Sequence, residues 1–246
     1  MEDTKEYLIL EIIGNKRTKS GDQISEWLHP KVEEMKQKMN DWDWSQPFEF
    51  EMPEKSLISE FHEILKDNGL PDELPEVGKF LLFESSRLTD FIKGSFLEQY
   101  GLIVSEKAKT LLTKFNLGNH NYFPITILHK GIVHDNYFFL KCLTNSNEYV
   151  DCNLSDFYTQ EGFFDKQSKK QIKFETKEEF TDFIQKTPSH KLYLFTDNII
   201  LNDRFPNFDL FKINDYGFNE MLVSKELANS LNKLTGITLT KTTKVK

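Results

Sequence analysis

The chain has 246 residues and a formal net charge of −8, with 38% hydrophobic and 13% aromatic residues. This length suffices for one large domain or two small ones with a buried core, which the 22 phenylalanines predict to be rich in aromatic rings. The first apolar run is too short for a signal peptide, and no stretch approaches the roughly 20 apolar residues of a membrane helix. We therefore expect a cytoplasmic protein without a membrane segment.

The negative charge is concentrated in one segment. Between Asp41 and Glu76 the sequence contains eleven acids and only two lysines, so the rest of the chain is close to neutral. This composition argues against nucleic-acid binding there, because phosphate contacts need Lys and Arg. It suits a basic protein partner, whose approach the field would steer. A solvated acidic face that only aids solubility is the alternative.

The first third of the chain predicts short elements of both kinds. The expected elements are a strand over Glu6–Gly14, a helix from Pro30 to Lys38, an extended segment over Asp41–Glu54, a helix over Lys55–Gly69, a strand over Lys79–Phe83 and a helix starting near Ser86. A proline-rich loop suggests a boundary near Pro75 to Gly78. We expect an acidic α+β lobe over 1–78 and a second α+β domain over 79–246, or one compact unit.

Two stretches repeat one local design. In LIVSEKAKTLLTKF (102–115) and MLVSKELANSLNKLTG (221–236), apolar strand residues precede a serine and an amphipathic helix follows it. The spacing predicts that Ser105 and Ser224 are N-caps, each accepting a hydrogen bond from a backbone N–H group that has no partner within the helix. Gly236 is expected to terminate the second helix. Both serines are thus predicted to be structural.

The chain between the two copies is rich in strand patterns. YFPITILHKGIVHDNYFFLKCL has two apolar runs around Lys130-Gly131, which predict a hairpin or two strands of a meander. EYVDCNLSDFY reads as a strand leading into a turn, KLYLFTDN and FDLFKI read as strands, and KEEFTDFIQK reads as a short helix. The prediction is an α+β fold: a mainly antiparallel sheet with peripheral amphipathic helices and two strand-Ser-helix units.

Residues with catalytic potential do not form a recognisable constellation. The six histidines are scattered, and the sequence contains no HExxH, CxxC, GxSxG or phosphate-loop motif. Among 39 acids no carboxylate pair stands out. The only basic cluster is the C-terminal LTKTTKVK, which we interpret as a frayed tail. We expect no catalytic residue, no metal site and no cofactor.

The two cysteines are predicted to be reduced core residues, with a strand-paired disulfide as the alternative. Cys142 lies in the apolar run FFLKCL, where burial would raise the pKa of its thiol. Cys152 follows Asp151, whose negative charge disfavours a thiolate. Neither has the surroundings of an activated nucleophile.

The order of the motifs resembles one family of bacterial immunity proteins from polymorphic toxin systems, the immunity family numbered eleven, first catalogued as a domain of unknown function. The stretches that carry the resemblance are LIVSEKAKTLL, YFPITI, NYFFLKCL, VDCNLSDF, LYLFTDNIIL and MLVSKELANSLNKLTGITL, between about Phe80 and Thr240. The segment from Met1 to Gly78 has no counterpart in it. The resemblance implies a non-enzymatic protein that binds and neutralises a cognate toxin, and it implies no catalytic residues.

If the toxin is basic, the acidic and aromatic segment is the expected binding surface. The candidate partner-binding residues are Asp41, Trp42, Asp43, Trp44, Phe48, Glu49, Phe50 and Glu51. The alternative is that Trp42 and Trp44 alternate into a sheet as core residues. A second candidate surface is the aromatic loop Phe157–Asp165, which could equally be a buried turn.

Two other functions stay open at this stage. One is an enzyme with an unrecognised site, built around His129 and His134 with Asp135 or Asp151. The other is a structural or adaptor protein without a toxin partner.

Overall fold

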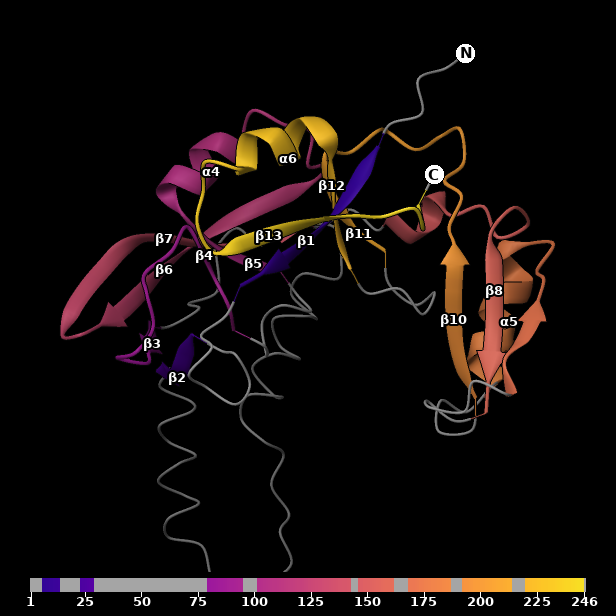
Figure 1. The fold of residues 1–246 in the computed structure, drawn as a ribbon, viewed down its shortest axis with the longest axis horizontal. Coiled ribbons are helices and arrows are strands. Elements are labelled where there is room, and N and C mark those ends of the chain that lie inside the picture. The colour runs from indigo at the N-terminus through magenta and orange to yellow at the C-terminus, as the bar shows by residue number, and fades with distance from the viewer. Residues whose placement is uncertain are drawn as a thin grey trace, which may run out of the picture.

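The computed structural model describes residues 6–13, 23–28, 79–94, 101–142, 146–161, 168–186, 192–213 and 220–245. The fold is α+β with mostly antiparallel sheets of six, four and three strands, as the sequence predicts (Figure 1). Among the described residues, no helix has both the length and the apolar composition of a membrane span.

The six-stranded sheet has the order β2-β3-β6-β7-β5-β4. Its strands are β2 (Ile24–Leu28), β3 (Lys79–Leu82), β4 (Phe91–Ile92), β5 (Leu102–Ser105), β6 (His120–His129) and β7 (Ile132–Cys142). β6 and β7 form a hairpin whose turn residues, Lys130 and Gly131, have φ of 53° and 74°. Positive φ at both central residues is a preferred geometry for a two-residue hairpin turn. The hairpin, one of the two predicted arrangements, is confirmed.

Helix α4 (Glu106–Leu112) carries the chain from β5 to β6. β5 and β6 lie on opposite sides of β7, and both are antiparallel to it. The helix therefore spans the central strand and covers one face of this part of the sheet.

The four-stranded sheet repeats this arrangement with the order β11-β12-β1-β13. Its elements are β1 (Tyr7–Ile12), β11 (Leu210–Lys212), β12 (Met221–Ser224), α6 (Lys225–Leu231) and β13 (Ile237–Lys241). α6 joins β12 to β13, which flank β1 on its two sides. The central strand of this sheet thus comes from the opposite end of the sequence.

The two arrangements match residue by residue. We call β4, β5, α4, β6 and β7 the first unit, and β11, β12, α6, β13 and β1 the second unit. Counted from the cap serines, the same positions pair in both: Phe91↔Val104 and Ser105↔Tyr137 in the first unit, Leu210↔Val223 and Ser224↔Tyr7 in the second. The similarity seen in the sequence therefore extends beyond strand-Ser-helix to whole sheets.

Both predicted N-caps are confirmed. The Ser105 side chain accepts from the backbone N–H of Ala108, and the Ser224 side chain accepts from that of Leu227, both at 3.2 Å. Each serine has an extended backbone, with ψ of 163° and 155°. A serine in this conformation ends a strand and starts a helix in one step.

One apolar cluster joins the two units. It contains Val104 and Leu112 from the first unit and Val223 and Leu231 from the second, all nearly inaccessible to solvent. α4 and α6 lie next to each other over it (Figure 1). The side chains that each helix buries therefore stabilise both units at once.

The outer faces of the sheets carry separate aromatic clusters. Fully buried phenylalanines include Phe80, Phe123 and Phe139 in the cluster of the six-stranded sheet, and Phe157 and Phe211 in a cluster that contains residues of the second unit and of the segment between the units. The prediction of an aromatic core is confirmed.

The segment between the units forms the third sheet, with the order β10-β8-β9. Its elements are β8 (Asp156–Gln160), β9 (Lys170–Ile172), α5 (Lys177–Lys186) and β10 (Tyr193–Asn198), preceded by a short 3-10 helix over Ser146–Tyr149. α5 confirms the predicted short helix. It buries Phe180 against Phe157 and Phe174, with ring centroids 5.5 and 5.2 Å apart.

The predicted helix near Ser86 is wrong. Residues 84–90 form a turn and an irregular segment that leads into β4. Polar groups distant in sequence bind this segment: the Gln23 side-chain amide donates to Arg87 O at 2.7 Å, and the Tyr137 hydroxyl donates to Thr89 O at 2.8 Å. These tertiary hydrogen bonds replace the local ones that a helix would need.

Three finer predictions also differ from the structure. In EYVDCNLSDFY the turn comes first, held by Asp151, and the strand β8 follows it. α6 ends at Leu231, and Gly236, with φ of 91°, lies at the turn into β13 instead of terminating the helix. The C-terminal tail is not frayed at Val245, which is buried and bridges Ile199.

Several predicted elements lie outside the described residues. These are the helix from Pro30 to Lys38, the extended segment over Asp41–Glu54, the helix over Lys55–Gly69 and the boundary near Pro75 to Gly78. β1 and β2 both precede residue 78, and they pair with strands that follow it.

Candidate functional site

The eight predicted partner-binding residues, Asp41, Trp42, Asp43, Trp44, Phe48, Glu49, Phe50 and Glu51, lie outside the described residues. Of the second candidate surface, residues 157–161 are described. Phe157 is fully buried, and Tyr158 is half-buried with the Lys169 Nζ 3.9 Å from its ring centroid. The start of this segment belongs to β8, and the part of the loop around Gly162 lies outside the described residues.

Each cap serine is bound to a carboxylate 15 residues earlier. Ser105 Oγ donates to Asp90 Oδ1 at 2.9 Å, and Ser224 Oγ donates to Asp209 Oδ1 at 2.6 Å. The serine N–H groups donate to the backbone carbonyls of the same aspartates at 2.8 and 2.9 Å. Because each hydroxyl both donates to an aspartate and caps a helix, these serines have the bonding of structural groups.

The two aspartates also connect the units to each other. Asp90 Oδ2 accepts from both the backbone N–H and the hydroxyl of Thr235, each at 2.9 Å. Asp209 Oδ2 accepts from the backbone N–H of Asn116 at 2.9 Å. Asn116 and Thr235 hold the same position after their cap serines, so each unit holds the chain that leaves the helix of the other.

The bonds around Asp90 determine its protonation. Burial alone would raise the pKa of this carboxyl, but the backbone N–H of Thr235, the hydroxyls of Ser105 and Thr235, and the charge of Lys107 outweigh it. The pKa is therefore lowered, and Asp90 is a carboxylate at neutral pH.

The residues proposed for an enzyme site are His129 and His134 with Asp135 or Asp151, and their side chains do not all meet at one place. His129 is buried, and burial together with the charge of Lys130 lowers its pKa despite hydrogen bonds to the backbone of Ser86 and Glu84. His134 and Asp135 are consecutive strand residues and project from opposite faces of the sheet. Asp135 accepts from the Thr126 hydroxyl at 2.9 Å.

Asp151 is not part of that hairpin. It precedes β8, and that strand lies at the other end of the view in Figure 1 from the turn between β6 and β7. Its carboxylate accepts from the backbone N–H groups of Asn153 and Leu154, both at 3.0 Å. This is the bonding of a turn-forming aspartate.

Both cysteines are free, as predicted. Burial raises the pKa of the Cys142 thiol to about 11, which confirms the expected direction. Within the described part of the chain, no group of three His, Cys, Asp or Glu side chains is arranged to hold a metal ion.

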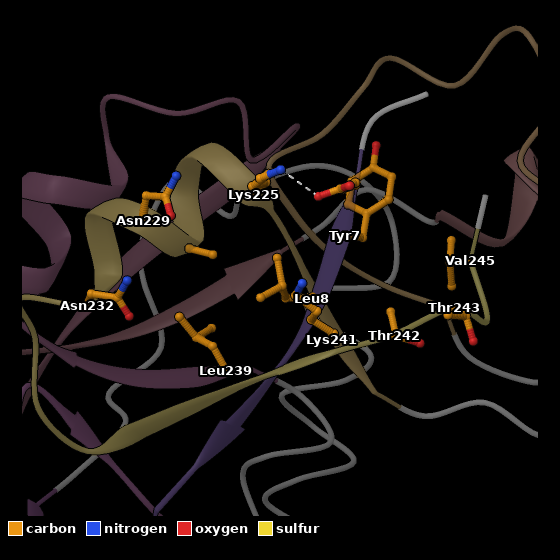
Figure 2. Close-up of a pocket in the computed structure, with 12 residues that line it drawn as sticks. Tyr7, Leu8, Lys225, Asn229, Asn232, Leu239, Lys241, Thr242, Thr243 and Val245 are labelled. Carbon is orange, nitrogen blue, oxygen red and sulfur yellow. Dashed lines mark ion pairs between the residues drawn. The ribbon is translucent and has the colours of Figure 1, made fainter. Parts of the chain in front are cut away.

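The structure reveals a groove that the sequence analysis missed. This α6 groove, of about 680 Å³, is lined by Asn229 of α6, Asn232 at the end of that helix, Leu8 of β1, and Leu239 and Lys241 of β13 (Figure 2). At one end the Lys225 ammonium lies 2.7 Å from a Glu6 carboxylate oxygen. The hydrogen bond from Lys225 and its positive charge lower the pKa of Glu6. The α6 groove has an apolar floor and a charged rim.

A second cavity, of about 860 Å³, lies where the irregular segment 84–89 meets the start of β13. Its walls include Gln23, Arg87 and Thr235. Gln23 and Thr235 already make the long-range hydrogen bonds described above. We interpret this cavity as a seam between structural elements.

Comparison with known proteins finds no family model that matches the chain and no match among curated proteins.

Proposed function

We propose that this chain is an immunity protein that binds and neutralises a cognate bacterial toxin without catalysing a reaction. The observation that carries the proposal is the order of six sequence motifs, framed by the two strand-Ser-helix copies, which resembles one immunity family. The bonding of Ser105 and Ser224 is consistent with it, because both hydroxyls serve the scaffold.

The charge distribution supports a basic toxin as the partner. The acidic excess between Asp41 and Glu76 would accelerate the approach of a basic protein, and such steering weakens at high salt. Trp42 and Trp44 lie among these acids, and tryptophan is a frequent hot-spot residue in interfaces. Carboxylates at Asp41, Asp43, Glu49 and Glu51 would pair with Arg or Lys of the toxin.

Co-expression tests the proposal. The product of the adjacent upstream reading frame is expressed in cells with and without this chain, and the purified pair is analysed for one-to-one binding. We expect the upstream product to arrest growth and this chain to restore it. A toxic product that neither binds this chain nor is neutralised by it would refute the proposal.

Two sets of variants separate binding from the alternatives. His129→Gln with His134→Gln should rescue as well as the wild type, because neither side chain has a catalytic role in this proposal. Replacing Asp41, Asp43, Glu49 and Glu51 by their amides should slow association by about tenfold at low salt. The matched control neutralises four exposed acids elsewhere, Glu161, Glu175, Glu178 and Asp182. Equal association rates for both sets of variants would show that the acidic segment is not part of the interface.

A further inference from the structure

The first unit fills the space between its helix and its sheet with its own side chains. The Lys109 Nζ of α4 lies 3.6 Å from the centroid of the Phe138 ring of β7 and 5.6 Å from that of the Tyr122 ring of β6. The two rings meet edge to face, with centroids 6.4 Å apart. The two rings and the ammonium group fill the space between α4 and the sheet. In the second unit the α6 groove lies at the equivalent place.

The second unit has smaller side chains at the same three positions. Leu8 takes the position of Phe138, because it pairs with Val223 as Phe138 pairs with Val104. Leu239 takes the position of Tyr122, because it pairs with Leu10 as Tyr122 pairs with Leu140. Ala228 is the fourth residue after its cap serine, as Lys109 is after Ser105. Two aromatic rings and a lysine are thus replaced by two leucines and a methyl group, and the α6 groove occupies the space.

The chemistry of the α6 groove matches one kind of occupant. Leu8 and Leu239 are half-buried and Ala228 is buried, so the floor offers apolar surface that is only partly covered. At the rim, Lys225 is already paired with Glu6, and Lys241 is exposed and adds a positive charge. The floor therefore suits a flat apolar group, and the rim suits a carboxylate beside it.

We propose that the α6 groove docks an aromatic side chain of a partner protein, with an acidic residue next to it in that partner. The incoming ring takes the place that Phe138 and Tyr122 fill in the first unit, and its neighbouring carboxylate pairs with Lys241. Identifying the partner as the toxin rests on the proposed function above. The docking chemistry itself rests only on the comparison of the two units.

The first experiment uses the full chain and three capped dipeptides, with binding followed by amide chemical shifts in NMR spectra. N-acetyl-Phe-Glu-amide should shift the amides of Leu8, Asn229 and Lys241. N-acetyl-Ala-Glu-amide and N-acetyl-Phe-Lys-amide should bind more weakly by about tenfold, because one lacks the ring and the other reverses the charge. Equal binding of all three, or shifts that lie elsewhere, would overturn the proposal.

A filled variant provides the matched control. Leu8→Phe, Leu239→Tyr and Ala228→Lys together copy the first unit and should abolish binding of the Phe-Glu probe while the melting temperature stays the same or rises. If this triple variant does not fold, Ala228→Lys alone, which copies the Lys109 position, should weaken probe binding by about tenfold. Undiminished binding to a folded filled variant would show that the probe sits elsewhere.

The toxin is tested separately. If this chain rescues cells from the toxin and the folded filled variant rescues equally well with unchanged affinity, the toxin does not use the α6 groove, although the proposed function stands. If no toxin is neutralised, the proposed function fails, and the dipeptide measurement still decides whether the groove takes an aromatic acid.

Discussion

Asp90 and Asp209 occupy equivalent positions in the two units, and each binds the cap serine of its own unit and the chain that leaves the helix of the other. A single carboxylate therefore fixes three things: the end of a strand, the start of a helix and the contact between units. Because the arrangement is reciprocal, each aspartate holds one of the two ends of the contact between units.

Removing a cap serine should destabilise the fold, and the two serines should differ. Ser105→Ala is expected to lower the free energy of unfolding by about 1 kcal/mol, the usual cost of losing an N-cap. Ser224→Ala should cost about 2 kcal/mol, because Asp209 is buried and its carboxylate loses a donor that water does not easily replace. Urea unfolding of each variant measures both values.

Ser230 provides the control for this pair. It lies inside α6 at a half-buried position, where alanine is a better helix former. Ser230→Ala should change the free energy of unfolding by less than about 0.5 kcal/mol. A loss at Ser230 as large as at Ser224 would contradict the capping argument.

The lowered pKa of Asp90 predicts a loss of stability in acid. A carboxyl whose pKa is lower in the folded chain than its ordinary value of about 3.9 stabilises the fold above that value. This contribution is lost as the pH falls through the folded pKa. The free energy of unfolding should therefore decrease below about pH 4, and Asp90→Asn should flatten this decrease while lowering stability at pH 7 by about 1–3 kcal/mol.

Asp182→Asn is the reference for the pH series. This carboxylate is exposed and pairs with Lys186 within α5. Because an exposed ion pair contributes little to stability, Asp182→Asn should change the free energy of unfolding at neutral pH by less than about 1 kcal/mol. If Asp90→Asn leaves the pH profile of the wild type unchanged, the Asp90 carboxylate does not contribute to acid stability.

The equivalent tyrosines, Tyr7 and Tyr137, should respond differently to loss of their hydroxyl groups. Tyr137 donates to the carbonyl of Thr89 at 2.8 Å, so Tyr137→Phe should cost about 1 kcal/mol. The buried hydroxyl of Tyr7 has no hydrogen-bond partner among the described residues. Tyr7→Phe should therefore leave the melting temperature unchanged or raise it. A marked loss at Tyr7 would indicate that this hydroxyl is bonded in solution.

Alanine variants of Gly236 and Gly131 should distinguish the cost of a steric contact from the cost of backbone strain. Both have positive φ, 91° and 74°. A Cβ at Gly236 would lie 2.3 Å from Phe91 O, whereas a Cβ at Gly131 would meet nothing within 4 Å. Gly131→Ala should cost about 1–2 kcal/mol, the strain of a left-handed residue, and Gly236→Ala should cost distinctly more. Thermal unfolding of the two variants compares them, and equal losses would argue against the close approach at Phe91.

Local features were predictable because short stretches determine them. The serine caps and the Lys130-Gly131 turn depend on neighbouring residues alone, and both predictions are confirmed. The helix expected near Ser86 failed because its backbone groups bind Gln23 and Tyr137, which are far away in sequence. The pairing of β1 with β12 and β13 likewise joins opposite ends of the chain and leaves no local pattern.

The two aspartates that link the units could have been identified from the sequence. The sequence DFIK begins at Asp90 and DLFK begins at Asp209, each 15 residues before a cap serine. Extending the comparison of the two copies toward the N-terminus would have identified both aspartates. The α6 groove could not have been predicted from the sequence. It depends on which β1 residue pairs with Val223, and that register is set by tertiary structure.

The position of β1 has a consequence for biosynthesis. The first unit is continuous in the sequence, so all its strands leave the ribosome before β11, β12 and β13 of the second unit. β1 is made before every strand of the first unit, whereas β13, which lies beside it, is made after them. The second unit therefore cannot close until the first unit and the third sheet have been made, and the nascent chain must keep the apolar residues of β1 from other contacts until then.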